Sequence, residues 1–220
     1  MIKQIELRNL LPCVFAGMED TDRIRSSQIW EEPSFVFHRG CRLCLHAESG
    51  NGKSSLLHFI YGSRKDYKGS ILFDGTDISA LSIAQWCDVR TKGIALLPQD
   101  MALFPELTVG QNIDLKNNIT HHKTSEQIKN LLARLGIDDK HDVAAGKLSI
   151  GQMQRVALVR AVCQPFDFIF LDEPVSHLDA RNNKIVADII TEEANNQGAG
   201  IISTSVGNHL MLDNAKFVSL

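Results

Sequence analysis

The sequence predicts an α/β fold in which a mixed β-sheet core carries an antiparallel β portion and an inserted helical subdomain. Short apolar segments typical of strands alternate with helical segments along most of the 220 residues, as in parallel sheets that are covered by helices. The earliest segments instead alternate apolar and polar residues, which favours antiparallel strands with one exposed face. A long middle stretch, residues 101–163, is mostly helical in character.

The first half of the chain contains most of the predicted strands. Residues 2–7 alternate apolar and polar side chains and predict a strand, whereas the charged run 19–28 indicates a surface loop. A helix is expected over residues 53–61, directly after a glycine-rich turn. Apolar runs bounded by turn residues predict the remaining strands; these are residues 34–37, 41–46, 69–75 and 94–97.

The second half resumes the alternation after the helical stretch, in which Gly136 and Gly146 are the expected breaks. Residues 168–171 are all apolar, which predicts a fully buried strand. A helix is predicted over residues 181–195 because its isoleucines recur on one face. Two terminal strands complete the prediction, at residues 201–202 and 217–220.

Length and composition limit the class of protein. At roughly 150 residues per domain the chain predicts one or two domains. We expect a single domain over residues 1–220, with a catalytic core of about 1–99 and 164–220 and a helical subdomain of about 100–163. Apolar residues at 44% and charged residues at 22% exclude disorder, collagen-like repeats and a disulfide miniprotein.

Charge and cysteine usage point to a cytosolic protein. The net charge of -3 shows no basic excess that would favour nucleic acid or an acidic membrane surface as a partner. No apolar run approaches the roughly 20 residues of a membrane span, and charged residues near the N-terminus argue against a signal peptide. Five cysteines, an odd number, favour reduced thiols.

The strongest motif is AESGNGKS at residues 47–54, which matches the phosphate-binding pattern G-x-x-x-x-G-K-[ST] with Ala47 in place of the first glycine. Small residues let backbone N–H groups surround phosphate oxygens, and the following helix presents its positive end to them. Lys53 is expected to reach the β- and γ-phosphates, and the Ser54 hydroxyl to ligate Mg²⁺. The candidate phosphate-binding residues are Ala47, Glu48, Ser49, Gly50, Asn51, Gly52, Lys53, Ser54 and Ser55.

Two further motifs lie in the second half of the chain, one at the end of the apolar strand 168–171 and the other about 20 residues before it. Residues 168–174, FIFLDEP, place two carboxylates at a strand end, where Asp172 can hold Mg²⁺ and Glu173 can polarise an attacking water. Taken without the phosphate loop, the motif would be explained equally well as an ordinary acidic pair between a strand and a loop. Residues 148–155, LSIGQMQR, predict a helix start with Ser149 as N-cap, and such an end also binds phosphate.

These three motifs, in this order and spacing, resemble the ATP-binding cassette (ABC) family over nearly the whole chain. The resemblance implies a P-loop NTPase fold of the ABC type, with ATP and Mg²⁺ as ligands. Residues 81–113 and 178–182 are similar to the small bacterial subunits of the lipoprotein-releasing, cell-division and macrolide-export class.

The resemblance also assigns roles to residues outside the phosphate loop. Gln99 matches the glutamine that senses Mg²⁺ and the γ-phosphate beside the membrane partner. LSIGQ matches the family signature with Ile150 in place of a glycine, and this signature completes the ATP site of the opposite subunit. The signature residues expected to contact ATP across a dimer are Ser149, Gly151 and Gln152.

Further matches concern the adenine, the subunit interface and the γ-phosphate. Phe15, or alternatively Val14, falls near the aromatic residue that stacks on adenine, and residues 176–179 match the interface D-loop. Ser205 occupies the position at which the family usually has a histidine that contacts the γ-phosphate. Hydrolysis is therefore expected to be slow.

The resemblance implies an ATP hydrolase that drives a separate transmembrane permease, as a homodimer or paired with another ABC subunit, peripheral on the inner face of the cell membrane. Apolar residues of 101–115 are equally good candidates for permease contacts and for subdomain core. The alternative is a degenerate, nucleotide-gated dimerisation module with little ATPase activity. Three departures from the family pattern favour it, namely Ala47, Ile150 and Ser205, and the intact Lys53, Asp172 and Glu173 oppose it.

Overall fold

The structure is a computed structural model that describes residues 1–18 and 20–220. In this part of the chain a five-stranded sheet has the order β6-β7-β8-β3-β9, and all of its neighbouring strands pair in parallel. Its strands are β3 (Arg42–His46), β6 (Ile94–Leu97), β7 (Phe168–Leu171), β8 (Gly200–Ser205) and β9 (Lys216–Ser219). The predicted strands 94–97 and 168–171 have these bounds in the structure.

A second sheet is antiparallel, as the early alternation predicts, and has the order β2-β1-β4-β5 in the described residues. Its strands are β1 (Gln4–Pro12), β2 (Ser34–His38), β4 (Tyr67–Phe73) and β5 (Thr76–Asp77). The pairing of β1 with β4 shifts register between Arg8 and Leu11. Gly69 has a positive φ of 88° opposite this bulge, and a Cβ there would lie 2.2 Å from the carbonyl oxygen of Asn9. Only glycine fits this close approach of two backbones.

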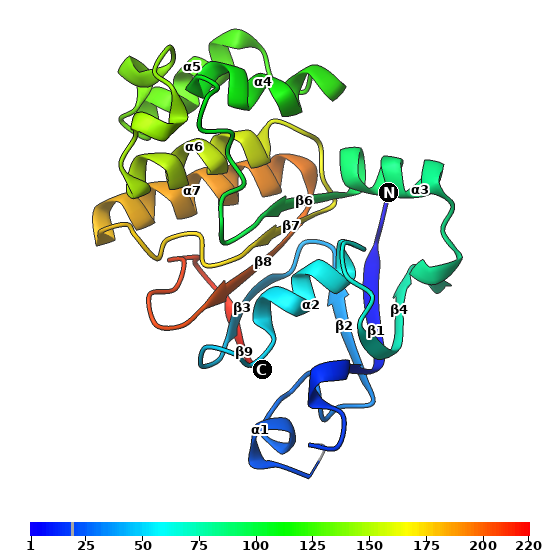
Figure 1. The fold of residues 1–220 in the computed structure, drawn as a ribbon. Helices are drawn as coiled ribbons and strands as arrows, with labels where there is room; N and C mark the ends of the chain where they lie inside the picture. The colour runs from blue at the N-terminus through cyan, green and yellow to red at the C-terminus, as the bar shows by residue number, and fades with distance from the viewer. Residues whose placement is uncertain (19) are drawn as a thin grey trace.

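The parallel sheet separates two apolar cores. Along β7, Phe168 and Phe170 belong to one core, and Ile169 and Leu171 belong to the other, as the two-residue period of a strand requires. Helix α2 (Lys53–Ile60) lies between the two sheets, and α6 (Ile150–Val162) and α7 (Ala180–Gln197) cover the opposite face (Figure 1). The fold is therefore layered, with helices on both faces of the parallel sheet.

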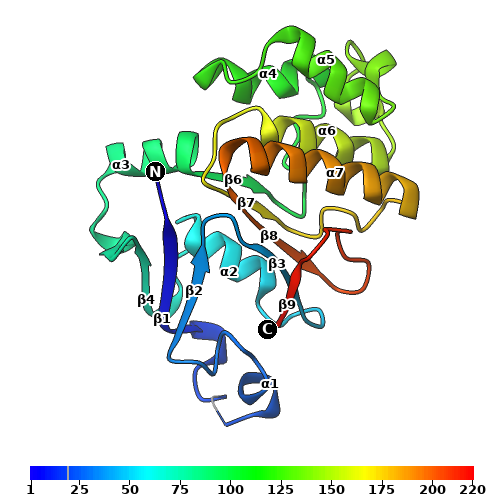
Figure 2. The same ribbon diagram turned by 180° about the vertical axis from the view of Figure 1, so that it is seen from behind.

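The middle stretch forms α4 (Val109–Thr120), α5 (Ser125–Arg134) and α6, which pack together in one core. Each begins at a capping box in which a hydroxyl residue pairs with a glutamine three residues later. Figure 2 shows α4 and α5 at the end of the molecule away from the antiparallel sheet. The division into a catalytic core and a helical subdomain remains our prediction.

Two short helices were not predicted. Helix α1 (Asp22–Arg25) lies inside the predicted loop 19–28, of which residue 19 is outside the described residues. Helix α3 (Ile83–Asp88) buries none of its residues, so its sequence lacks the apolar period that reveals a helix. One-turn 3₁₀ segments occur at Cys13–Phe15, Ile78–Ala80, Asp138–Lys140 and Ala145–Lys147, and a π-helical segment at Val89–Gly93. None of the described helices is both long and apolar enough to cross a membrane.

Candidate nucleotide-binding site

The parallel sheet delivers the predicted site residues to one edge, since parallel strands share the edge at which they end. Strand β3 ends at His46 and continues into the phosphate loop, and β7 ends at Leu171, directly before the two carboxylates. Strand β6 ends at Leu97, two residues before Gln99, and β8 ends at Ser205. Residues far apart in the sequence are thus neighbours here.

The phosphate loop meets α2 at Gly52, which has a left-handed conformation with φ 90°. A Cβ at Gly52 would lie 3.2 Å from the Trp30 ring and 3.4 Å from Phe15, so its space and its φ both favour glycine. The Trp30 indole N–H donates to the Asn51 carbonyl oxygen at 3.2 Å. Ala47 is not among the described residues with positive φ, so alanine replaces the usual glycine without backbone strain.

Lys53 is buried and arches back over the loop. Its Nζ donates to the carbonyl oxygens of Ala47 at 2.8 Å and Glu48 at 2.9 Å. Burial lowers the pKa of Lys53, and the nearby carboxylates of Glu173 and Asp172 act in the opposite direction. A buried ammonium held by carbonyls at the loop is well placed to receive a phosphate group.

Asp172 offers one oxygen that has no partner in the described chain. It is 3% exposed, and its Oδ1 accepts a hydrogen bond from the Thr204 hydroxyl at 2.6 Å. The other oxygen, Oδ2, is buried and makes no hydrogen bond within the described residues. A buried carboxylate oxygen without a donor is costly unless a cation or a proton reaches it.

Glu173 and Gln99 lie together beside this carboxylate. The Gln99 side-chain amide donates to Glu173 Oε2 at 3.4 Å, and the Glu173 N–H donates to Thr204 Oγ1 at 3.0 Å. Glu173 has a positive φ of 49°, which is uncommon for a residue with a side chain and is frequent at functional turns.

Two adjoining cavities gather these groups. One, of about 230 Å³, is lined by Val14, Phe15, Ser49, Gly50, Gly52, Lys53, Ser54, Ser55, Gln99 and Glu173. The other, of about 300 Å³, is lined by Ser54, His58, Pro98, Gln99, Asp100 and Asp172. Ser54 and Gln99 belong to both walls. The structure therefore brings the phosphate loop, Gln99 and the two strand-end carboxylates into one continuous site.

The donor set fits a hard cation better than a transition metal. Ser54, Gln99 and the unpaired Oδ2 of Asp172 offer hydroxyl, amide and carboxylate oxygens, the ligands that Mg²⁺ prefers together with phosphate and water. No group of three or more His, Cys, Asp or Glu side chains within the described residues could hold a metal ion by itself.

The two candidates for adenine stacking line the same cavity but differ in exposure. Phe15 is 3% exposed and lies under the loop against Gly52, whereas Val14 is 71% exposed. Val14 therefore presents more surface to a base, and Phe15 supports the loop beneath it. Which of them contacts adenine remains a prediction.

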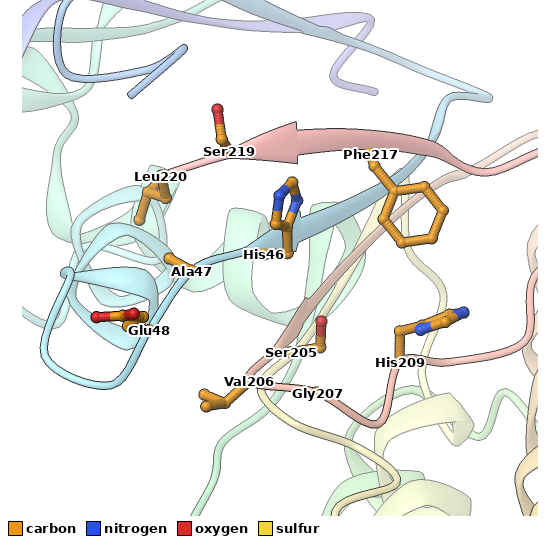
Figure 3. Close-up of a pocket in the computed structure, with 10 residues that line it drawn as sticks. All are labelled: His46, Ala47, Glu48, Ser205, Val206, Gly207, His209, Phe217, Ser219 and Leu220. Atoms are coloured by element: carbon orange, nitrogen blue, oxygen red, sulfur yellow. The ribbon is translucent and has the colours of Figure 1, made fainter. Parts of the chain in front are cut away.

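Ser205 lines neither of these cavities but a third one, of about 530 Å³, on the other flank of the phosphate loop. Figure 3 shows Ser205 and His209 on its wall together with Ala47 and Glu48. Ser205 is 3% exposed, and its hydroxyl lies 3.5 Å from the Cys44 sulfur. The His209 ring packs edge-on against Phe217, with a distance of 5.2 Å between ring centroids.

The signature residues lie apart from the phosphate loop of their own chain. Ser149 caps α6, where its Oγ accepts the Gln152 N–H at 3.3 Å and the Gln152 side chain accepts the Ser149 N–H at 2.9 Å. Gly151 lies close to the His177 carbonyl, which a Cβ would approach to 3.2 Å. None of the three lines either phosphate-loop cavity of the same chain. The contact with ATP across a dimer, which the resemblance implies, remains a prediction.

Sequence reasoning missed the residues that support the site from a distance. Thr204 bridges Asp172 and the Glu173 backbone. The buried Gln154 donates to the Glu173 carbonyl at 3.0 Å and accepts the His177 N–H at 3.3 Å. The position of Thr204, directly before the strand-end Ser205, could have drawn attention to it. However, no sequence pattern shows that its hydroxyl contacts the neighbouring strand.

Comparisons with known proteins agree with this geometry. The sequence profile of the family described as "ABC transporter" matches residues 30–176. Xylose import ATP-binding protein XylG of Shigella flexneri serotype 5b (strain 8401) is 35% identical over 190 residues, covering 83% of this chain and 36% of the relative. XylG of Escherichia coli (strain K12) is 35% identical over 156 residues, covering 67% of this chain and 30% of the relative.

Solved structures share the fold at lower identity. Dimeric MJ0796, described as a bacterial ABC transporter cassette, gives a TM-score of 0.73 at 20% identity and covers 98% of this chain and 94% of its own. A bacterial Atm1-family ABC exporter with ATP bound gives 0.72 at 22% identity, covering 99% of this chain and 37% of that one.

The layered α/β fold and the P-loop site thus define an ATP-binding cassette, and the chain belongs to the ABC transporter family. The expected ABC-type fold is confirmed. The chain spans about a third of the length of the curated relatives that it matches, 36% in the case of XylG from Shigella flexneri.

Proposed function

We propose that the chain is the ATP-binding subunit of an ABC transporter, which binds and hydrolyses Mg·ATP and drives a separate membrane permease. One observation carries this proposal. Lys53, the unpaired Oδ2 of Asp172 and the Glu173–Gln99 pair meet at the phosphate loop, where a nucleotide triphosphate, a divalent cation and an attacking water are needed together.

Each residue of this cluster has a chemical task in the proposed reaction. Lys53 and the loop amides bind the β- and γ-phosphates, and Ser54, Gln99 and Asp172 would hold Mg²⁺, which would neutralise phosphate charge. Glu173 orients the attacking water and accepts its proton, while the Gln99 amide keeps that carboxylate in place. A solved relative of the fold, MJ0796, is described as a dimer in a post-hydrolysis state with ADP and Pi.

Removal of the Lys53 charge tests the nucleotide site. Lys53→Ala is expected to weaken ATP binding about 100-fold or more, since a charge-assisted contact to phosphate is lost. Titration calorimetry with Mg·ATP measures this, with Lys129→Ala as the matched control because Lys129 is an exposed lysine of α5. Equal ATP affinity of Lys53→Ala and the control would contradict the proposal.

The alternative of a nucleotide-gated dimerisation module keeps one specific observation in its favour. The Ser205 hydroxyl is buried against Cys44 and lines neither phosphate-loop cavity, so it is a weak substitute for a phosphate-contacting imidazole. Ala47 no longer supports this alternative, because its φ needs no glycine. ATP binding without steady-state phosphate release, with the permease present, would favour the module over the hydrolase.

The finer class and the permease surface are also proposals. The segments 81–113 and 178–182 support the lipoprotein-releasing, cell-division and macrolide-export class, whereas the curated relatives are described as xylose import proteins. Within residues 101–115, which follow Gln99 in the sequence, Phe104 is 53% exposed and Leu115 is 47% exposed, while Met101 and Leu103 pack against the helical core. We propose Phe104 and Leu115 as permease contacts on the inner face of the membrane. Co-purification of the chain with the permease encoded beside its gene tests the finer class, through the identity of the permease, and the contact surface. Phe104→Ser is the variant expected to lose the permease.

A further inference from the structure

The segment that follows Gln99 contains two consecutive residues in a strained backbone conformation. Met101 has φ 61° and Ala102 has φ 45°, values that residues with a Cβ adopt rarely and at a cost. Neither residue is glycine or asparagine, which tolerate this region best. Something outside the segment must hold it there.

The guanidinium of Arg160, from the signature helix α6, donates hydrogen bonds to both strained residues. Its two terminal nitrogens donate to the carbonyl oxygens of Met101 at 2.6 Å and Ala102 at 2.8 Å. The planar fork of arginine suits two adjacent acceptors, and its donors carry a full charge. Burial lowers the pKa of Arg160, and the nearby Asp100 acts in the opposite direction. A second cation, Lys116 of α4, also faces this place, and burial together with Arg160 lowers its pKa.

The backbone on either side of the segment is anchored independently. The Met101 N–H donates to the Pro98 carbonyl at 2.9 Å, and the Phe104 N–H donates to the buried Asn112 side chain at 2.9 Å. Between these anchors, Arg160 holds the turn in its left-handed form. Since Gln99 lies at the start of the turn and its amide is only 3.4 Å from Glu173, the turn's conformation sets where that amide lies.

We infer that Arg160 is a positioning residue, which holds the strained turn at Met101 and Ala102 and thereby places Gln99 against Glu173. The kinetic consequence of this inference rests on the proposed ATPase function. The structural part, that the hydrogen bonds of Arg160 to Met101 and Ala102 hold the turn (the Arg160 pin), does not. Ser149 is the N-cap of the same helix, so Arg160 also connects the Gln99 turn to the helix that carries the signature residues.

Three variants test the pin by its effect on turnover. Arg160→Met keeps much of the side-chain length but has no donors, and we expect it to lower kcat for Mg·ATP about 10- to 100-fold, with ATP affinity within about twofold. Arg160→Lys retains the charge and donors on a single nitrogen but loses the two-nitrogen fork, so its kcat is expected to lie between those of wild type and Arg160→Met. Ala102→Gly added to Arg160→Met should recover most of the lost kcat, because glycine adopts positive φ without Arg160.

Hydrogen exchange of the nucleotide-free chain tests the pin without any activity. In Arg160→Met the amides of Met101 and Phe104 should exchange about tenfold faster or more, and the added Ala102→Gly should slow them again. Arg134→Met is the matched control, because Arg134 of α5 pairs with the exposed Glu192 away from the turn. If Arg160→Met does not fold, Arg160→Lys is compared with wild type in the same way.

The outcomes separate the two proposals. Unchanged exchange at Met101 and Phe104 in the Arg160 variants, or a loss of kcat that Ala102→Gly fails to recover, would overturn the positioning role. Absence of ATP binding by the wild-type chain would instead overturn the proposed function, and the exchange data would still decide whether Arg160 holds the turn.

Discussion

Ser205 occupies the position at which we predict that a single side chain limits the rate of the proposed hydrolysis. Its hydroxyl lies 3.5 Å from the Cys44 sulfur inside β8 and β3, and the residue is 3% exposed. The preserved groups, Lys53 and Glu173, face the cavity on the other flank of the loop. At the residue scale, we therefore expect Ser205 to slow hydrolysis while ATP binding through Lys53 stays near normal.

Restoring an imidazole at this position should raise turnover. Loss of one preorganised donor to a developing charge typically costs about 10²–10³ in rate, so Ser205→His is expected to increase steady-state ATPase activity about tenfold or more at saturating Mg·ATP. The cavity beside Ser205, of about 530 Å³, has room for the larger ring. The rival explanation is Ile150, and in that case Ile150→Gly would raise turnover while Ser205→His would not. No gain from Ser205→His, alone or in the double mutant, would refute a limiting role for this position.

Residue-scale prediction from sequence succeeded where a function depends on neighbours in the chain. The phosphate loop and the Asp172–Glu173 pair are local patterns, so their positions could be read directly. Thr204, Gln154 and Arg160 escaped because their partners are far away in sequence, 58 residues in the case of the Arg160–Ala102 bond. Polar contacts between distant segments leave no periodic trace.

At the element scale, three helices of the middle stretch begin in the same way, which gives a matched pair of variants. Ser149 caps α6 and Thr124 caps α5, each with a glutamine that completes a capping box. Either cap replaced by alanine should lower the free energy of unfolding by about 0.5–2 kcal/mol. Only Ser149→Ala should also impair ATP-induced dimerisation, because only Ser149 is predicted to contact nucleotide.

Denaturant unfolding and size measurements with Mg·ATP check both parts of this prediction. A Thr124→Ala variant that loses dimerisation as strongly as Ser149→Ala would show that helix stability, and not a nucleotide contact, explains the effect.

The connection between α4 and α5 should make stability depend on pH. Burial lowers the pKa of His122, Lys123 acts in the same direction and Glu193 opposes, and Nε2 of His122 is buried without a partner in the described chain. The unfolded chain protonates this ring near pH 6.5 and the folded chain only at lower pH, so stability falls as pH drops through about 6.5. His122→Asn should reduce the loss of unfolding free energy between about pH 7.5 and about pH 5.5.

The exposed neighbour provides the comparison for this experiment. His121→Asn changes a histidine in the same connection whose side chain is exposed. If His122→Asn and His121→Asn alter the pH dependence of urea unfolding equally, burial of the His122 ring is not its cause.

Element-scale prediction from sequence worked for buried elements and failed for exposed ones. Strands β6 and β7 were predicted at their observed bounds because they are continuous apolar runs. Helix α3 was missed because it buries no residue, and its first residue, Ile83, is 85% exposed. Where packing does not select the side chains, the pattern that sequence reasoning depends on is absent.

At the scale of the whole molecule, one parallel sheet separates two cores and carries a candidate nucleotide site, which we predict a second subunit completes. The signature end of α6 exposes Ile150 at 51%, and the signature residues line neither phosphate-loop cavity of the same chain. The parallel pairing of the strands, though not their order, could be anticipated from the alternation of strands and helices. The meeting of two subunits could be anticipated only from the family resemblance, because the partner's residues belong to another copy.

The dimer should become visible when hydrolysis is blocked. Glu173→Gln keeps the shape of the side chain but cannot accept a proton from water, so Mg·ATP should accumulate and hold two chains together. Light scattering after size exclusion should show the dimeric mass of this variant with Mg·ATP and the monomeric mass without it.

In the Glu173→Gln background, Ile150→Glu should prevent dimerisation because it places a charge beside the predicted nucleotide contact of Ser149. Ile83→Glu is the matched control, since Ile83 is even more exposed and lies on α3, outside the predicted interface. A Glu173→Gln chain that remains monomeric at saturating Mg·ATP, although calorimetry shows the nucleotide bound, would argue against the shared site. Equal dimerisation of the Ile150→Glu and Ile83→Glu variants would place the interface elsewhere than at the signature end of α6.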